Sequence, residues 1–252
     1  MKEAYVKTDI EKEIGTIEFF HPQSNSLPGN ILAQLTTAIQ EAGKNAKIKV
    51  VVLQSAGRKA FCAGASFDEL VAIENKEDGL AFFSGFANVI NAMRQCPKFI
   101  IGRIHGKCVG GGVGLASAVD YAIAKEGAGI KLSELSVGIG PFVVGPAVER
   151  KMGKAAFAQL SIDATTWRSA NWARGKGLYA EVYPDTDGMD ESIKRLAESL
   201  VESNPQAMAE LKKTCWQGTD HWDTLLAERA AISGELVLSD FTKKAIQQFK
   251  KK

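Results

Sequence analysis

Hydrophobic and polar positions alternate at the start of the chain and change to a helical spacing soon afterwards. Residues 6–10 and 17–19 alternate on either side of the charged segment 11–13, which predicts two half-buried antiparallel strands. Apolar residues between 31 and 42 recur at helical spacing, and residues 47–53 end in a β-branched run. The pattern therefore predicts a pair of strands followed by a helix and a buried strand.

The same succession of helix and strand returns in the middle of the chain. The pattern predicts a helix over residues 80–93 and a strand over 99–104, followed by a glycine-rich turn. A short helix is predicted over residues 113–118, and a further strand over 121–124. Strands that alternate with helices in this way are typical of an α/β core.

The last part of the chain has a helical pattern only. Asp190 is the predicted N-cap of the first of these helices. Three apolar stripes at helical spacing follow, over residues 193–201, 208–215 and 222–232. The change of pattern near Asp187-Gly188 divides the chain into an α/β core over residues 1–187 and a helical C-terminal module over 188–252.

The composition is that of a globular protein and narrows the classes of partner. The 252 residues are 45% hydrophobic, which is enough to bury a substantial core. The 31 basic and 29 acidic residues leave a net charge of +2, which gives no reason to expect nucleic acid or a membrane surface as a partner. No apolar stretch is long enough to span a bilayer, so we expect a cytoplasmic protein. The 4 cysteines and 3 histidines are too scattered to predict a metal site or a disulfide framework.

Three segments rich in small residues follow predicted strands. They are residues 59–67, 109–114 and 132–141. Small residues let a ligand approach the backbone closely, so that N–H groups of the first two segments can bind it, while the third segment offers the carboxylate of Glu134. An oxyanion hole needs two such donors about 2.7–3.1 Å from one oxygen, and a proton transfer beside it needs a carboxylate. The sequence supplies both kinds of group.

The motifs in these segments resemble those of a known family. In order, they are Phe61-Cys62-Ala63-Gly64-Ala65, Gly110-Gly111-Gly112, Asp120-Tyr121-Ala122-Ile123-Ala124, and Glu134 with Gly138. In order and spacing they are similar to the motifs of the crotonase (enoyl-CoA hydratase/isomerase) family. The resemblance implies a crotonase-like spiral of ββα units with a helical C-terminal module, an acyl-CoA thioester as substrate, and assembly into a homotrimer or homohexamer.

The resemblance also implies roles for individual residues. The backbone amides of Ala65 and Gly111 would hold the thioester oxygen, and Glu134 would be the carboxylate at the reacting carbons. Contacts with the acyl group or coenzyme A are implied for Ala63, Gly64, Ser66, Phe67, Gly110, Gly114 and Phe142. Coenzyme A would enter as part of the substrate, and no separate cofactor or metal ion is expected.

The sequence departs from the hydratase pattern at the position of a second glutamate. Hydratases of the family carry two glutamates, and Gly114 stands where the first is expected. No acidic residue lies between Glu134 and Glu149, so the additional aspartate of dienoyl-CoA isomerases is also missing. One carboxylate is enough to take a proton from carbon 2 of a 3-enoyl-CoA and return it to carbon 4. The sequence therefore favours double-bond isomerisation over hydration.

Several alternatives stay open or rank lower. The chain is also compatible with a hydratase that uses a non-standard second group, or with a catalytically silent CoA-binding or scaffold protein. Gly112–Ser117 resembles a dinucleotide-binding turn in part, but the next strand begins by Tyr121, which leaves too short a helix for a nicotinamide dehydrogenase. A serine hydrolase with Ser66 or Ser117 as nucleophile ranks last, because no histidine is placed near either by the sequence.

Overall fold

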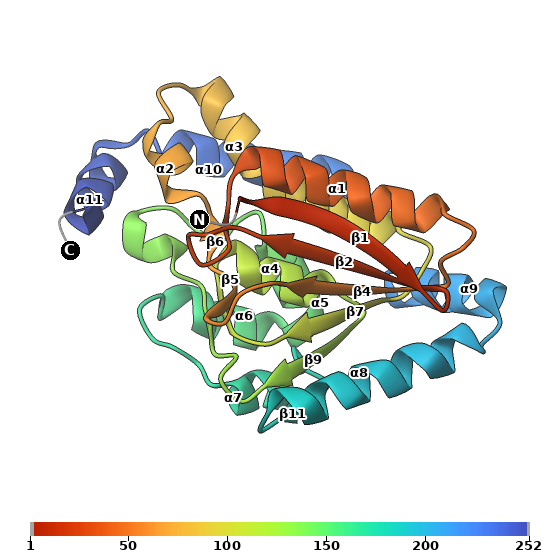
Figure 1. Cartoon of the computed structure of the whole chain (residues 1–252). Coiled ribbons are helices and arrows are strands. Elements are labelled where there is room, and N and C mark those ends of the chain that lie inside the picture. Colours follow the sequence, from red (N-terminus) through yellow and green to blue (C-terminus); the bar gives the residue numbers. More distant parts are fainter. Residues whose placement is uncertain (1–2, 251–252) are drawn as a thin grey trace.

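A six-stranded sheet forms the centre of the molecule. The computed structural model describes residues 3–250 (Figure 1). In spatial order the strands are β1 (Tyr5–Glu11), β2 (Ile14–Phe20), β4 (Val50–Ser55), β7 (Ile100–Ile104), β9 (Tyr121–Lys125) and β11 (Glu181–Tyr183). Strands β1 and β2 pair antiparallel and the other neighbours pair parallel, so the strands predicted from the hydrophobic pattern are confirmed.

The first two strands form a hairpin with a two-residue turn. Lys12 and Glu13 both have positive φ angles, 49° and 62°, as in the left-handed turns whose twist matches that of paired strands. Most of β1 is exposed, and this edge strand carries charged side chains that discourage pairing with another chain. The charged segment between the two alternating stretches is therefore the hairpin turn.

Helices cover both faces of the sheet. Helices α1 (Gly29–Lys44) and α3 (Lys76–Gln95) lie on one face, and α8 (Thr186–Val201) lies on the other (Figure 1). Val51 of β4 belongs to the core beneath α1 and α3, whereas its neighbour Val50 packs with the apolar residues of α8. A strand with both faces buried needs a continuous apolar run, which explains the sequence of β4.

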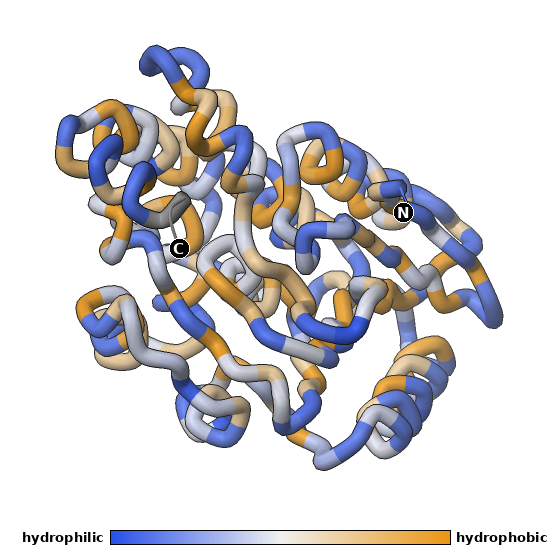
Figure 2. Tube along the Cα trace, turned by 60° about the vertical axis from the view of Figure 1, so that its left-hand side comes forward, coloured by the Kyte–Doolittle hydropathy of each residue, from blue (hydrophilic) through white to orange (hydrophobic). Residues whose placement is uncertain are grey.

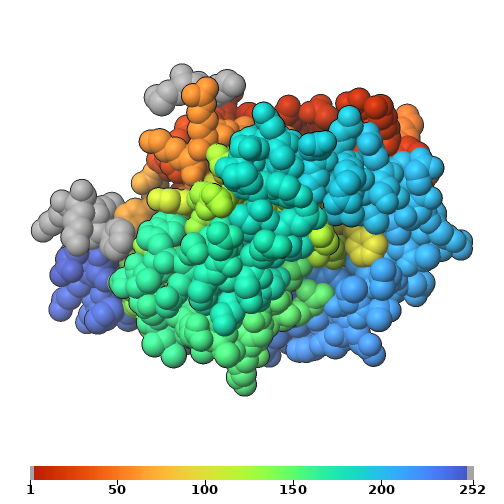
Figure 3. Space-filling model, turned by 90° about the horizontal axis from the view of Figure 1, so that it is seen from below, coloured from red at the N-terminus to blue at the C-terminus, as the bar shows by residue number. Residues whose placement is uncertain are grey.

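The C-terminal part of the chain is helical, as predicted. It consists of α8, α9 (Pro205–Cys215), α10 (Trp222–Leu236) and α11 (Asp240–Lys250). Figure 2 shows orange and blue segments alternating along the helices, as expected for helices that bury one face. Figure 3 shows the underside of the molecule, where α8 (cyan) and α9 (blue) lie beside the green segment of α5 (Gly145–Met152) and α6 (Lys154–Ile162). Within the described residues, no helix is both long and apolar enough to cross a membrane.

The prediction that Asp190 caps α8 was wrong. The helix begins at Thr186, and the side chain of Asp185 is the N-cap, accepting a hydrogen bond of 2.8 Å from the backbone N–H of Gly188. Asp190 lies inside the helix and pairs with Arg103 of β7, with 2.6 Å between Oδ1 and Nε. Both aspartates suit a helix start, and the long-range pairing with Arg103 is not visible in the local sequence.

Short strands and turns beside the large sheet position the candidate site. One small sheet has the order β10 (Ile130–Lys131), β8 (Lys107–Val109), β5 (Ala60–Cys62), and the other pairs β3 (Ser26–Leu27) with β6 (Gly64–Ala65). The helices that follow these strands are α2 (Phe67–Val71), α4 (Gly111–Ala118) and the 3₁₀ helix η1 (Glu134–Val137), while α7 (Ala170–Gly175) precedes β11. All pairings in the two small sheets are parallel, so the strands of each sheet end at the same edge, and Gly64 of β6 lies close to Val109 at the end of β8.

Candidate active site

The three segments singled out in the sequence meet at this edge. Strands β6, β8 and β10 lead directly into α2, α4 and η1, so each strand ends where a turn begins. The backbone N–H of Gly110 donates a hydrogen bond of 2.9 Å to the carbonyl oxygen of Lys131, which joins the second segment to the strand that leads into the third. The structure thus brings together residues that lie far apart in the sequence.

Glycines make the close approach of these segments possible. Gly64 has a φ of 93°, and a side chain there would place its Cβ only 3.1 Å from the carbonyl oxygen of Val109. The same Cβ would lie 3.7 Å from the backbone nitrogen of Gly111, and a Cβ on Gly112 would collide with the carbonyl oxygen of Cys62. Only residues without a side chain let β6 lie directly beside the start of α4.

The backbone N–H of Gly111 is positioned to donate a hydrogen bond to a ligand. Gly111 is the first residue of α4, and the first N–H groups of a helix have no acceptor within the helix. Gly110 precedes it with a φ of 51°, which a residue with a side chain rarely adopts. Ala65 is the last residue of β6 and lines the same cavity as Gly111. Two predicted donors therefore border one space.

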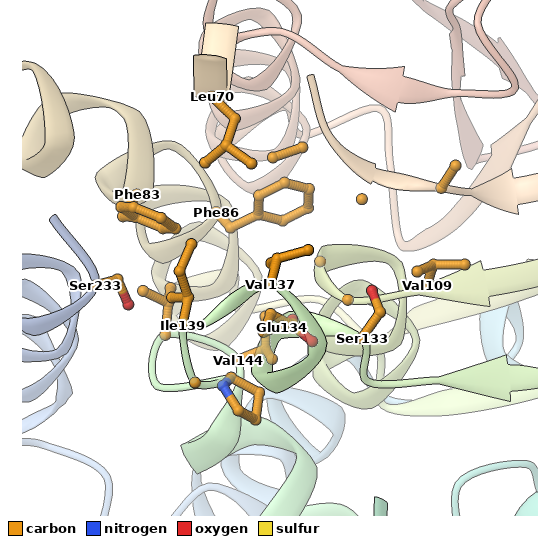
Figure 4. A pocket seen from close by; sticks show the side chains of 18 of the residues that line it. Leu70, Phe83, Phe86, Val109, Ser133, Glu134, Val137, Ile139, Val144 and Ser233 are labelled. Carbon is orange, nitrogen blue, oxygen red and sulfur yellow. The ribbon is translucent and has the colours of Figure 1, made fainter. Parts of the chain in front are cut away.

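The carboxylate of Glu134 lies directly against the backbone of the second segment. A Cβ on Gly110 would be 2.9 Å from Oε1 of Glu134, so the glycine leaves the space that the carboxylate occupies. Glu134 is the first residue of η1, and although the residue as a whole is half-buried, its Oε2 is buried and has no hydrogen-bond partner within the described chain. Figure 4 shows the carboxylate between Val144 and Ser133.

Burial changes the acidity of Glu134. It raises the pKa of the carboxyl group to about 7, because removal from water disfavours the charged form, and a hydrogen bond from the residue's own backbone N–H opposes this in part. A carboxyl group with a pKa near neutrality can both accept and return a proton under ordinary conditions. The surroundings of Glu134 are therefore those of an acid/base group.

An apolar cavity of about 330 Å³ surrounds these groups. Its wall is mainly aromatic and aliphatic, and Figure 4 shows the side chains of 18 of the lining residues. Among the described residues that line it, Glu134 is the only carboxylate and Lys131 the only cation. Of the predicted contact residues, the lining includes Ala63, Gly64, Ala65, Phe67, Gly110, Gly111 and Phe142.

Two of the predicted contact residues do not line the cavity. Ser66, which is 4% exposed, caps α2 instead: its hydroxyl oxygen accepts a hydrogen bond of 3.3 Å from the backbone N–H of Glu69. Gly114 is buried inside α4, and a Cβ there would lie 2.5 Å from Cγ1 of Val144. Gly114 is therefore separated from the cavity, because the packing of α4 places Val144 over it.

The individual residues that form the far wall of the cavity were not identified from the sequence. It includes Phe82, Phe83 and Phe86 of α3, Ile139 and Val144 after η1, and Ser233 of α10. The helical spacing of residues 80–93 indicated that one face of α3 is buried, but periodicity does not tell whether a face packs on a core or on a ligand. The contribution of Ser233 comes from another part of the chain and has no local signal.

The comparison with known proteins identifies the class to which this fold and site belong. Residues 9–252 match the family described as enoyl-CoA hydratase/isomerase. The chain therefore belongs to the enoyl-CoA hydratase/isomerase family, the crotonase family that its motifs resemble. This family acts on acyl-CoA thioesters.

Individual relatives include both hydratases and isomerases. The chain is 28% identical over 245 residues to a probable enoyl-CoA hydratase of Bacillus subtilis (strain 168), with 96% of this chain and 94% of the relative covered. It is 24% identical over 229 residues to the mitochondrial Delta(3,5)-Delta(2,4)-dienoyl-CoA isomerase of Homo sapiens, with 85% and 69% covered. The solved structure of an enoyl-CoA hydratase from Bacillus halodurans superimposes with a TM-score of 0.89 at 21% identity, over 97% of this chain and 99% of that one. The crotonase fold predicted from the motifs is confirmed.

Proposed function

We propose that the protein is an enoyl-CoA isomerase in which Glu134 is the only acid/base group. One observation carries the proposal: Glu134 is the only carboxylate among the described residues that line the cavity. A hydratase of this family uses two carboxylates to position a water molecule, whereas movement of a double bond needs one group that takes a proton and returns it. The single buried carboxylate therefore favours isomerisation.

The reaction moves one proton from one carbon of the substrate to another and neither adds atoms to the substrate nor removes them. The Glu134 carboxylate takes a proton from carbon 2 of a 3-enoyl-CoA, and the electron pair of that C–H bond spreads over a dienolate that ends on the thioester oxygen. The protonated Glu134 then returns the proton to carbon 4, which forms a 2-enoyl-CoA and restores the carboxylate. One group can reach both carbons because the dienolate is flat and bound in one orientation.

The backbone N–H groups of Ala65 and Gly111 are assigned to the thioester oxygen. Negative charge develops on this oxygen in the dienolate, and donors that are already in place stabilise it without reorganisation. Gly111 contributes in addition the positive end of the α4 dipole, which favours the same charge. The close approach of β6 to α4, which requires Gly64, supports a common target for the two amides.

The cavity walls fit an apolar acyl chain better than a reacting water molecule. Phe83 and Phe86 extend along the wall from α3, and Ile139 and Val144 lie across from them (Figure 4). Phe82 of the same helix also lines the cavity. An apolar wall lacks the hydrogen-bonding groups that hold a water in place. This wall therefore supports transfer of a proton between two carbons of the substrate over addition of water.

The deciding experiment offers 2-enoyl-CoA and 3-enoyl-CoA to the purified protein in one assay. We expect migration of the double bond to be faster than hydration. Efficient hydration of 2-enoyl-CoA would favour a hydratase with a non-standard second group. Binding of coenzyme A esters without turnover of either substrate would favour a silent CoA-binding protein.

The pH dependence of the reaction follows from the raised pKa of Glu134. Because the ionised carboxylate is the base, kcat/KM is expected to fall as the pH drops below about 7 and to reach a plateau above it. Measurement of kcat/KM with 3-enoyl-CoA from about pH 5 to pH 9 tests this. An inflection near the ordinary pKa of a glutamate would contradict proton removal by the buried carboxylate.

A second carboxylate can be introduced only if Val144 is removed as well. Gly114→Glu alone is expected to lower the thermal midpoint, because its Cβ would stand 2.5 Å from Val144 and 3.6 Å from Ile90. The double variant Gly114→Glu/Val144→Gly provides space and is expected to raise the ratio of hydration to isomerisation. Val144→Gly alone is the matched control. If the folded double variant hydrates no faster than this control, the missing carboxylate does not explain the preference.

The assembly expected from the family is also a proposal. We propose a homotrimer or a pair of trimers. Sedimentation at micromolar concentration measures the mass directly, and a monomer would contradict the proposal.

A further inference from the structure

A second cavity of about 460 Å³ lies on the underside of the large sheet. Strands β7 and β9 begin at its floor, α8 forms one wall, and α5 and the end of α9 form the other. Figure 3 shows the hollow between α8 and α9, with part of its floor visible in yellow. Within the described chain, its lining shares no residue with that of the candidate active site.

Two cations stand at one side of this cavity. The guanidinium carbon of Arg150 is 3.7 Å from the centroid of the Trp216 ring, and the group donates a hydrogen bond to the carbonyl oxygen of Cys215. Nζ of Lys151 donates to two backbone carbonyl oxygens, at 3.0 and 2.8 Å. A guanidinium group has five N–H donors and an ammonium group three, so each cation retains donors for a ligand.

Neither cation forms an ion pair with a carboxylate in the described part of the chain, although Asp120, which also lines the cavity, offsets part of the charge of both. Asp120 is near both, but its Oδ2 accepts from Lys212 at 2.9 Å and its Oδ1 from the Trp216 indole at 2.9 Å. Among the described residues, no acid forms an ion pair with Arg150 or Lys151. Burial lowers the pKa of both, that of Lys151 to about 8. Burial outweighs the effect of Asp120 on both cations, so an anion beside them would offset a cost of burying charge that the fold compensates only in part.

The other residues that line the cavity indicate what kind of chain the ligand carries beside its charged group. Apart from Asp120, whose two oxygens contact Lys212 and Trp216, and Cys215, they have apolar and aromatic side chains, namely Phe99, Ile101, Tyr121, Leu196 and Leu200. An aliphatic chain would remove these walls from water, whereas an inorganic anion would leave them wet. The planar guanidinium of Arg150 matches the two oxygens of a carboxylate.

We propose that this cavity is a second binding site, which takes an aliphatic carboxylate. The carboxylate lies against Arg150 and Lys151, and the chain lies along Leu196 and Leu200 of α8. The site is separate from the one that holds the acyl-CoA, so both ligands bind at the same time.

Cys215 provides a reporter in the unmodified protein. Its thiol is exposed and the residue lines the second cavity, whereas Cys62, Cys96 and Cys108 are buried and burial raises the pKa of all three thiols. N-ethylmaleimide is therefore expected to label Cys215 first. Sodium octanoate is the probe: it should slow this labelling, and octanol, which has the same chain without the charge, should not.

Variants that remain folded test whether the positive charge of Arg150 contributes to octanoate binding. Arg150→Gln keeps a donor for the carbonyl of Cys215 and removes the charge, and is expected to weaken octanoate binding about 10-fold or more in calorimetry. Lys154→Gln, an exposed lysine on the next helix, is the matched control and should bind octanoate as the parent does. Thermal unfolding without ligand checks that both variants are folded.

Three results would overturn the proposal. One is competition between octanoate and saturating coenzyme A thioester, which would place octanoate in the first cavity. Another is equal octanoate affinity in the parent and in folded Arg150→Gln. The third is failure of octanoate to bind or to protect Cys215, which includes the case in which another copy of this chain fills the hollow.

Discussion

Replacing Glu134 with glutamine is expected to slow double-bond isomerisation by about 10²–10⁴-fold, the contribution of a positioned general base. Glutamine keeps the shape of the side chain and cannot accept the proton from carbon 2. Exchange of that proton with solvent should fall with the rate of isomerisation. The affinity for coenzyme A should hardly change, because the carboxylate lies at the reacting carbons in the proposed mechanism.

The stability of this variant distinguishes loss of a catalytic group from loss of the fold. Oε2 of Glu134 is buried without a hydrogen-bond partner within the described chain, so a neutral amide should cost no more to bury than the carboxylate. We therefore expect the thermal midpoint of Glu134→Gln to be at least that of the parent. Glu126→Gln, at an exposed position in the turn after β9, is the control and should keep full activity. If folded Glu134→Gln isomerised as fast as the parent, another group would be the base.

Removal of the backbone N–H of Gly111 is expected to give the second-largest effect. Gly111→Pro deletes this donor at the first position of a helix, where proline is otherwise tolerated. Any Cβ at this position meets the ring of Phe86, so Gly111→Ala, which keeps the N–H, is the matched control. The turnover of the proline variant should be roughly 10²–10³-fold lower than that of Gly111→Ala, which is the typical effect of losing one oxyanion donor.

The comparison of the two Gly111 variants separates catalysis from packing. Both carry a Cβ that Phe86 must accommodate, so the change in stability common to both reports the packing. Free coenzyme A should bind the two variants with similar affinity, since the donor is directed at the thioester oxygen and free coenzyme A has none. Equal turnover of folded Gly111→Pro and Gly111→Ala would remove Gly111 from the oxyanion site.

The local sequence was sufficient for the elements and for the chemical groups of the candidate site. Hydrophobic period depends on neighbouring residues, so the hairpin, the buried strand β4 and the helical C-terminal part could be predicted from spacing alone. The glycines of the first two segments and Glu134 were visible because their order and spacing are those of the family motifs. The start of α8 could not be predicted to the residue, because Asp185 and Asp190 both suit the local pattern of an N-cap, and the structure shows that Asp185 caps the helix.

The tertiary structure decided how those groups behave. The pKa of Glu134 is raised to about 7 only because segments far apart in the sequence remove its carboxylate from water. There is no room for a second carboxylate at position 114, because Val144, the N-cap residue of α5, packs against Gly114. The wall contributed by Ser233 and the cations of the second cavity likewise depend on contacts between distant residues. The order of amino acids specifies which chemical groups are present. Packing specifies which of these groups are buried, paired or available to react, because burial and charge compensation depend on residues that come together only in the folded chain.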